Sequence, residues 1–297
     1  MATIYTHKDS NIKKTWLLML TFFFVILGVG WSFSYILDSP IILWVAVIIS
    51  VLMNIGAYWF SDKLVLKMSG AKPASRESHR ELWNILENLS ITAGLPMPKL
   101  YIINDPAPNA FATGRDAEHA VVAVTTGLLS MLERNELEGV IAHELSHIGN
   151  RDMLVMTVVV VLVGFVTLLS DFFLRMSIHG GNDRDNRAGL ILIIAGFILA
   201  LLSPIVAKLI QLAISRKREF LADASGALLT RYPEGLASAL QKISLYSAPM
   251  RRANHATAHL FISNPFGAMQ GGKFLNRLFM THPPVEERIT ALRGRSE

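Results

Sequence analysis

The chain has 297 residues, of which 52% are hydrophobic and only 17% are charged, and its mean hydropathy is +0.40. A soluble domain of this size normally carries more charge, so these values favour membrane spans over a large soluble core. Cysteine is absent, which excludes a disulfide framework and a thiolate metal site. The formal charge of +5 is modest and no dense basic run with interleaved aromatic residues occurs, so we expect no nucleic-acid partner.

Four long apolar runs dominate the chain, and each has roughly the 20 residues that cross the hydrocarbon of a bilayer. They are Trp16–Leu37, Ile41–Phe60, Met153–Leu174 and Leu190–Ile214. A cleaved signal peptide is the alternative for the first run, but its apolar core is too long and no small-residue cleavage site precedes the next run. The third and fourth runs flank a polar motif and could instead pack partly against protein.

Lysine and arginine gather on one side of these runs, which predicts the orientation of the chain. They lie before the first run, after the second and after the fourth, at Lys8, Lys13, Lys14, Lys63, Lys67, Lys72, Arg76, Arg80, Arg216, Lys217 and Arg218. The link at 38–40 carries no positive charge. We therefore expect both termini and the 61–152 segment in the cytoplasm, and the 175–188 link, whose charges are mixed, outside.

The two stretches outside these runs, 61–152 and 215–297, are expected to form one small α+β domain around a small sheet, attached to the helical membrane parts 1–60 and 153–214. The residue patterns predict helices at Arg76–Ile91, Glu136–Gly149, Gly235–Leu245 and Val285–Arg293 and strands at 99–103, 109–114 and 119–124. We expect Asn135 to cap the second helix. Gly, Asn and Pro in Met250–Lys273 predict a mobile loop.

The segment "GVIAHELSHIGNRD", residues 139–152, places two histidines four residues apart with a glutamate beside the first. On a helix such histidines lie on one face, so His143 and His147 can offer ring nitrogens to a single ion. Glu144 points too far round the helix to complete the same tetrahedron, and can instead act on a water at an open position of the metal. These are the roles of the H-E-x-x-H pattern: two zinc ligands and a general base. The alternative, two core histidines that only form hydrogen bonds, explains neither the spacing nor the glutamate.

The segment "SRKREFLADASG", residues 215–226, supplies candidates for the third protein ligand that a catalytic zinc needs. Glu219 and Asp223 lie four residues apart and would share one helical face. Glu219 can bind the metal, while Asp223 can accept the free ring N–H of a ligand histidine. The alternative is a charged helix end at the membrane surface, where the three basic residues before Glu219 are expected anyway. The histidine motif favours the metal site.

Together, "HELSHIGNRD", "RKREFLADASG", "NAFATG" and "THPPVEERI" resemble the HtpX family of membrane zinc proteases, which is related to the Ste24 type of CAAX prenyl protease. The resemblance covers nearly the whole chain. It implies a zincin-like metalloprotease domain, and a zinc-dependent endopeptidase of the bacterial inner membrane that acts from the cytoplasmic side in membrane-protein quality control under stress. It implies one Zn²⁺ per chain, with His143, His147 and Glu219 as ligands, Glu144 as the catalytic base and Asp223 as the acid behind a ligand histidine.

Two further segments match the substrate site of that family. "NAFATG" resembles an edge strand that pairs with an extended substrate, which points to Asn109, Ala110 and Phe111. "THPP" resembles a segment with a histidine near the scissile carbonyl, so His282 could hydrogen-bond the oxyanion. The alternatives are an ordinary strand and a histidine that only closes the loop before the last helix. We expect Arg288 to pair with an acid near the site.

The resemblance and the apolar runs together imply unfolded or membrane proteins as substrates and the lipid bilayer as a partner, while nothing in the sequence indicates an oligomeric state. Two other functions are compatible with such a chain: a processing protease for lipidated tails, and a membrane scaffold or metal-regulated binding protein with a vestigial site. Four spans are few for the enclosed chamber of the first, and no base or ligand is missing as the second requires. His255 and His259 also lie four apart but lack an adjacent acid, so we expect them at the surface.

Overall fold

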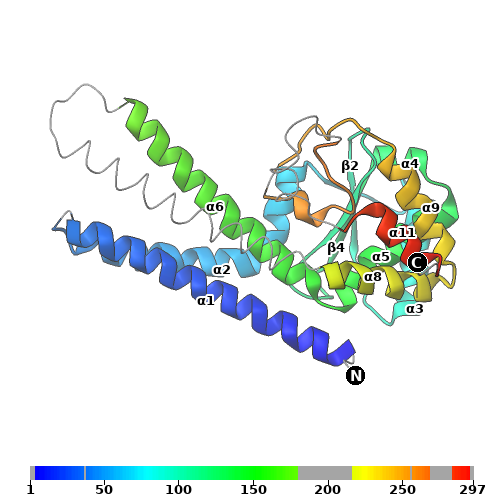
Figure 1. Ribbon diagram of the computed structural model, residues 1–297, viewed down its shortest axis with the longest axis horizontal. Coiled ribbons are helices and arrows are strands. Elements are labelled where there is room, and N and C mark those ends of the chain that lie inside the picture. Colours follow the sequence, from blue (N-terminus) through cyan, green and yellow to red (C-terminus); the bar gives the residue numbers. More distant parts are fainter. Residues whose placement is uncertain (1–3, 37, 180–215, 255, 268–282, 295–297) are drawn as a thin grey trace.

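The computed structural model describes residues 4–36, 38–179, 216–254, 256–267 and 283–294. This described part has two regions: long helices that extend to one side, and a compact domain at one end of them (Figure 1). It is a mainly helical α+β fold with a small mixed sheet, as the sequence predicts.

Three long helices form the extended region: α1 (Ile4–Ile36), α2 (Ile41–Ser69) and α6 (Asp152–His179). α1 and α2 are each long and apolar enough to cross a membrane, and α5 (Arg134–Gly149) with α6, bent by 83° at their junction, passes the same test as one broken span. Within the described residues the chain therefore has two or three candidate spans. The fourth predicted run, Leu190–Ile214, lies outside the described residues, so four spans remain a prediction.

The outer surfaces of α1 and α2 carry large apolar side chains. Those more than half exposed include Trp16, Phe24, Trp31, Trp44 and Leu52. Soluble monomers rarely expose apolar surface on this scale, which marks these helices as the part of the molecule that faces a bilayer.

α2 also connects the membrane region to the domain, because it continues beyond the predicted end at Phe60 to Ser69. Val65 and Leu66 in this extension are buried in a core that includes residues of the sheet. Gly70 ends the helix in the left-handed conformation, with φ of 68°, and its N–H is directed at the carbonyl groups of the last turn.

The domain contains a four-stranded sheet in the order β1–β2–β4–β3. Its strands are β1 (Lys72–Pro73), β2 (Lys99–Ile103), β3 (Ala110–Thr113) and β4 (Val121–Thr125). β2 and β4 are parallel, and β3 runs antiparallel to β4 at one edge. The three longer strands lie where the sequence predicts strands, while β1 is too short to leave a recognisable pattern.

α5 is the central helix of the domain and packs against α3 (Arg80–Ala93), α8 (Arg216–Thr230) and α9 (Pro233–Ser244). α8 and α9 belong to the part of the chain that follows the apolar runs, so two distant stretches of sequence meet on α5. The shorter helices are α4 (Thr126–Met131), η1 (Ala258–Leu260) and α11 (Val285–Leu292).

The start of α5 differs from the prediction, because Glu133 and not Asn135 is the N-cap. Glu133 forms a capping box with Glu136, and the Glu133 N–H donates to the Glu136 carboxylate at 2.9 Å. The same carboxylate accepts bonds from Ser238 and Lys242 of α9 at 2.6 and 2.8 Å. Asn135 looks like a cap from residue preference alone, but the bonds of Glu136 to α9 fix the helix start two residues earlier.

The segment 250–267, apart from residue 255, packs against the sheet and α6. Its buried members include Met250, Ala256, Leu260 and Phe261. His259 is 1% exposed and its Nε2 lies 2.9 Å from the carbonyl oxygen of Met156. The prediction that His259 lies at the surface is therefore wrong, because apolar neighbours on both sides of it enter the core. His255 and residues 268–273 lie outside the described part.

Candidate metal centre

α5 carries His143 and His147 one turn apart on its buried face, with exposed fractions of 1% and 6%. Val140, Ile141 and Leu145 of the same helix pack in the domain core, which fixes the face of α5 that points inward. The two Nε2 atoms are 3.2 Å apart. The helix thus presents two ring nitrogens to one point, as the four-residue spacing predicts.

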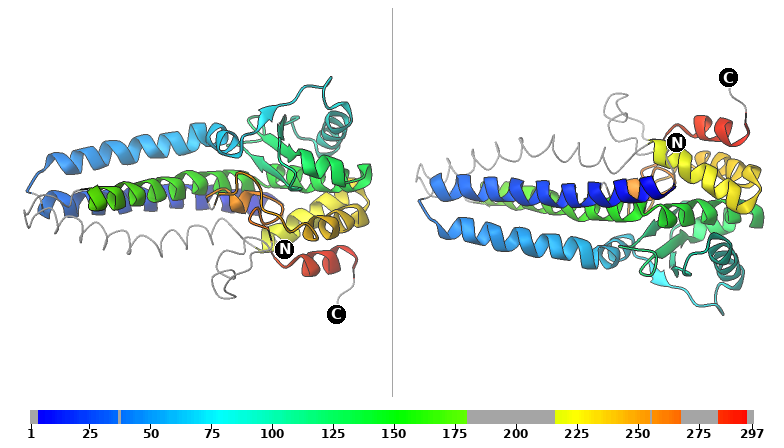
Figure 2. Two further views of the ribbon diagram at one scale, coloured as in Figure 1. Left: turned by 90° about the horizontal axis from the view of Figure 1, so that it is seen from above. Right: turned by 90° about the horizontal axis from the view of Figure 1, so that it is seen from below.

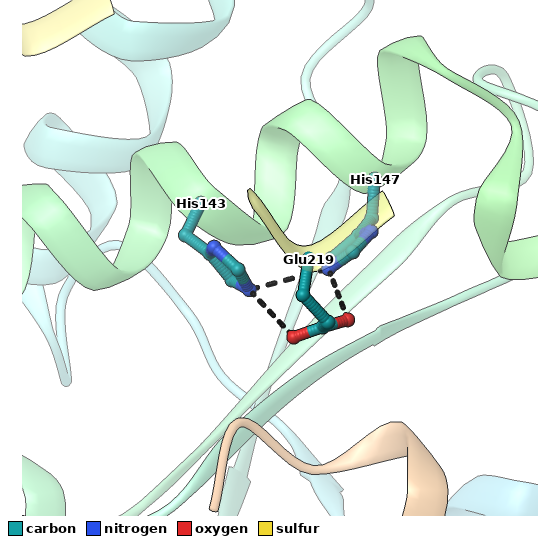
Figure 3. Close-up of side chains that lie close together, drawn as sticks. All are labelled: His143, His147 and Glu219. Atoms are coloured by element: carbon teal, nitrogen blue, oxygen red, sulfur yellow. Dashed lines mark hydrogen bonds and ion pairs between the residues drawn. The ribbon is translucent and has the colours of Figure 1, made fainter. Parts of the chain in front are cut away.

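α8 brings Glu219 to these rings from a distant part of the chain (Figure 3). Its Oε2 lies 3.9 Å from Nε2 of His143, and its Oε1 lies 3.6 Å from Nε2 of His147. The three ligand atoms all lie within 4.8 Å of one another. Ligands about 2.1 Å from one tetrahedral ion lie about 3.4 Å from each other, so these separations suit a single metal ion.

The second nitrogen of each ring faces a carboxylate. Nδ1 of His143 lies 2.9 Å from Oδ1 of Asp223, and Nδ1 of His147 lies 3.1 Å from Oδ2 of Asp152. The His143 contact has the length of a hydrogen bond but not its angle. An acid at Nδ1 favours the proton there and leaves a lone pair on Nε2. Two lone pairs and a carboxylate directed at one buried point need a cation between them, and this set of donors fits Zn²⁺.

Asp152 is a candidate that sequence reasoning missed, although it ends the quoted motif. α5 ends at Gly149, and the chain turns at Asn150 and Arg151, whose φ of 56° lies in the left-handed region. α6 then begins at Asp152, and the 83° bend between the helices brings this carboxylate back to His147. The sequence feature that could have identified Asp152 is its position five residues after a candidate ligand histidine.

Arg288 of α11 supplies the expected pairing with an acid, and the acid is Asp223. Its Nε and Nη2 donate to the two oxygens of Asp223 at 2.8 and 2.6 Å, and its Nη1 lies 3.8 Å from Oε2 of Glu219. Arg288 is fully buried. A two-pronged contact of this kind fixes the orientation of a carboxylate, so Arg288 holds Asp223 in place behind His143.

Glu144 lies beside the first histidine and is also buried. Burial raises the pKa of its carboxyl to about 7, although the charge of His147 and a hydrogen bond from the backbone of Ala112 act in the opposite direction. A carboxyl with a pKa near neutrality can both accept and return a proton, which suits a general base.

The two histidines differ in protonation in the metal-free protein. Burial lowers the pKa of His143, against the opposing effect of Asp223. Burial also disfavours charge on His147, but the hydrogen bond to Asp152 and the charge of Glu219 outweigh it and raise the pKa of this ring to about 9. His147 therefore holds a proton that a metal ion must displace.

The predicted substrate strand corresponds to β3 and the residue before it, and the segment 261–263 lies along its outer edge. Nδ2 of Asn109 donates to the carbonyl oxygen of Ser263 at 3.0 Å, and the Ser263 N–H donates to Oδ1 of Asn109 at 3.2 Å. The carbonyl oxygen of Ala110 accepts from the Ile262 N–H at 3.0 Å. This part of the edge is therefore already hydrogen-bonded within the chain.

Phe111 is buried, and its ring packs edge-on against Phe261 with centroids 5.1 Å apart. The next residue, Ala112, reaches Glu144 through its backbone, so β3 passes beside the candidate base. His282, the predicted oxyanion donor, lies outside the described residues.

A model of peptidase family M48 matches residues 76–296. The chain belongs to this family. An M48 relative called "Protease HtpX homolog" from Caldanaerobacter subterraneus subsp. tengcongensis is 49% identical over 98% of both chains, and one of the same name from Tropheryma whipplei is 47% identical over 98% of both. The crystal structure of S. mikatae Ste24p matches with a TM-score of 0.51 and 18% identity, covering 97% of this chain and 67% of that one, which shows a shared fold. The resemblance to the HtpX family is confirmed, and this M48 protein is a membrane metallopeptidase of the HtpX type.

Proposed function

We propose that this M48 peptidase is a zinc-dependent endopeptidase that hydrolyses misfolded or damaged membrane proteins at the cytoplasmic face of the bacterial inner membrane, as part of quality control under stress. The observation that carries the catalytic part is the meeting of His143, His147 and Glu219, whose ligand atoms lie within 4.8 Å of one another in a buried site. The similarity to HtpX homologues over the whole chain supports the family's type of activity.

The chemistry divides between the ion and Glu144. Zn²⁺ held by His143, His147 and Glu219 would polarise the scissile carbonyl and lower the pKa of the attacking water. Glu144 takes a proton from that water as the oxygen attacks the carbonyl carbon, and then gives the proton to the leaving amine. A pKa of about 7 lets this carboxyl perform both transfers near neutral pH.

The substrate would bind as an extended strand beside β3. Asn109, Ala110 and Phe111 contribute through the shape and backbone of this edge, because their side chains are buried. Since the carbonyl of Ala110 is bonded to Ile262, pairing would begin further along β3 or displace that bond. His282 would donate a hydrogen bond to the developing oxyanion.

The choice of membrane-associated substrates is supported by where the site lies. His147 is separated from α6 only by the turn after Gly149, and α6 is long and apolar. The distribution of lysine and arginine favours a cytoplasmic position for this side of the molecule. Loops and tails that leave the bilayer at its inner face would therefore reach the site first.

Glu144→Gln tests the catalytic assignment. The variant should keep about one zinc per chain. The rate of casein cleavage should fall at least about 100-fold, because the amide of glutamine cannot accept a proton from the attacking water. Glu138→Gln is the matched control, since Glu138 lies on the same helix, is partly exposed and pairs with Arg134 at 3.0 Å. Wild-type cleavage by Glu144→Gln would refute the assignment.

A separate experiment tests the choice of substrate. It compares the cleavage rates of two unfolded chains with the same sequence, one soluble and one tethered to the membrane by a helix. The tethered chain should be cleaved faster by the enzyme in nanodiscs, because it is held near the site. Equal rates would refute the preference for membrane proteins, and cleavage confined to a lipidated tail would favour the processing protease.

A further inference from the structure

Asn11 of α1 is a buried polar residue at the first position of the first candidate span. Its Nδ2 donates to Oδ1 of Asp152 at 2.6 Å and to the carbonyl oxygen of Asn150 at 3.1 Å. Near its amino-terminal end α1 approaches the start of α8 (Figure 2), where Arg218 lies close to Asn11, and α1 also packs against α6. A membrane helix from the start of the sequence therefore contacts the turn that follows the histidine motif.

Asp152 connects this amide to the metal centre. Its Oδ2 faces Nδ1 of His147 at 3.1 Å, while its Oδ1 accepts the bond from Asn11. Arg218 of α8 lies on the same side, with Nε 3.6 Å from Oδ1 of Asp152 and Nη1 3.5 Å from Oδ1 of Asn11. All four side chains are buried, so protein partners rather than bulk water set the orientation of the carboxylate.

We propose that Asn11 is a positioning residue for the metal centre. By holding Oδ1 of Asp152, it keeps Oδ2 directed at His147 and so keeps Nε2 of that ring aimed at the ion. Without Asn11, Oδ1 of Asp152 would keep the longer 3.6 Å contact with Arg218, which opposes rotation about the Cβ–Cγ bond less than the 2.6 Å hydrogen bond from Asn11 does. The first membrane helix then forms part of the metal centre as well as anchoring the protein. This inference rests on the proposed zinc site.

The obvious alternative is that Asn11 only holds α1 against α6. Zinc affinity separates the two roles, because residues behind metal ligands typically change metal affinity about 10–100-fold. Asn11 acts one residue further away, so Asn11→Leu, which has similar size and no amide, should weaken zinc binding about three- to tenfold. Thr15→Val is the matched control: Thr15 lies one turn along α1, is equally buried, and bonds the backbone carbonyl of Asn11 rather than Asp152.

The experiment uses the full chain in nanodiscs. Zinc affinity is measured by competition with a chromophoric chelator, and the visible spectrum of the Co²⁺-loaded protein reports the geometry of the ligands. Asn11→Leu should show weaker zinc binding and an altered cobalt spectrum, whereas Thr15→Val should match the wild type in both. In an Asp152→Asn background, Asn11→Leu should cause no further loss of affinity, because its effect passes through Asp152.

Wild-type zinc affinity and an unchanged cobalt spectrum in Asn11→Leu would overturn the proposal, whatever the melting temperature of the variant. A full additional loss in the Asp152→Asn background would overturn it as well. If Asn11→Leu does not fold, Asn11→Ala takes its place with the same criteria. Failure of the wild-type protein to bind zinc would instead refute the proposed function, so the two failures are distinguishable.

Discussion

At the scale of single residues, each histidine of the candidate metal centre has an acid behind its ring and an arginine beside the acid. The two chains of contacts are His143–Asp223–Arg288 and His147–Asp152–Arg218. Each acid orients a ring, and each arginine compensates the charge of a buried acid. The arginine–acid contact is stronger at His143 than at His147. Arg288 makes two hydrogen bonds to Asp223, whereas Nε of Arg218 lies 3.6 Å from Oδ1 of Asp152.

The pH dependence of zinc binding should follow His147. In the metal-free protein its pKa is about 9, above the ordinary value of 6.5, so below pH 9 zinc must displace a proton. Apparent zinc affinity should therefore rise about tenfold per pH unit as the pH increases from 7 towards 9, and level off above it. Chelator competition across this range measures the slope. Asp152→Asn, which removes the partner that raises this pKa, should move the plateau to lower pH, and a flat profile in the wild type would contradict the assignment.

Arg288 should matter far more than an arginine in a surface pair. Arg288→Met removes the guanidinium that makes two hydrogen bonds to Asp223 and leaves a buried carboxylate without this compensating charge, which typically costs about 3–5 kcal/mol. We expect a large fall in the melting temperature together with loss of zinc. Arg293→Met is the control, because Arg293 forms an exposed pair with Glu234 and should have little effect. Similar melting temperatures for the two variants would contradict the role of Arg288.

At the scale of elements, the candidate metal centre depends on how closely α8 approaches α5. Gly226 of α8 lies against the backbone of α5, where a Cβ atom would be 3.0 Å from the nitrogen of His143 and 3.2 Å from the carbonyl carbon of Ala142. The backbone of a packed helix cannot yield as a flexible side chain can. The absence of a side chain at Gly226 therefore lets Glu219, on the same helix, reach the histidines.

Gly226→Ala should push α8 away from α5 and enlarge the distances between Glu219 and the histidines. We expect destabilisation of about 1–3 kcal/mol, as for overpacked sites, and a measurable loss of zinc affinity. Gly56→Ala in α2 is the control, because no atom of the described residues lies within 4 Å of a Cβ there, and alanine favours a helix over glycine by about 1 kcal/mol. Thermal melting and zinc titration check both variants. Unchanged zinc affinity in Gly226→Ala would contradict this prediction, because it would show that zinc binding does not depend on the close approach of α8 to α5 at Gly226.

Elements with a clear period were predictable, and contacts between distant elements were not. α5 and the strands β2 and β4 follow from apolar spacing, because the same faces that repeat in sequence are buried in the domain. The cap at Glu133 depends on α9, and the burial of His259 depends on α6. Because α9 and α6 are distant in sequence from the residues they contact, local residue preferences predicted the wrong cap for α5 and the wrong burial for His259.

The candidate site divides in the same way. The proximity of His143 and His147 follows from helical spacing, and Glu219 was accessible through its own spacing to Asp223 and through family resemblance. Asp152 needs the 83° bend between α5 and α6, and Asn11 needs α1 to lie against that bend. No local pattern encodes such a contact between residues 141 positions apart.

At the scale of the whole molecule, the candidate site lies where the membrane helices meet the domain. Asn11 begins the candidate span in α1, Asp152 begins α6, and α2 enters the domain core through Val65 and Leu66. All three helices therefore meet the domain at the same level. An orientation that places this level at the inner face of the bilayer puts the peptidase site where cytoplasmic loops emerge.

Single-cysteine labelling can test that orientation, because the chain has no native cysteine. A membrane-impermeant maleimide should label Ser39→Cys and Asn182→Cys in intact spheroplasts, since both lie in links with little or mixed charge, and should label Ser78→Cys only after lysis. Ser78 is the control for access, as it is exposed in the segment rich in lysine and arginine. Labelling of Ser78→Cys from outside would invert the topology and refute a cytoplasmic site. Labelling of Ser39→Cys without Asn182→Cys would mean that the third and fourth apolar runs do not both cross, which would leave the two-helix anchor of α1 and α2 and the Asn11 contact intact.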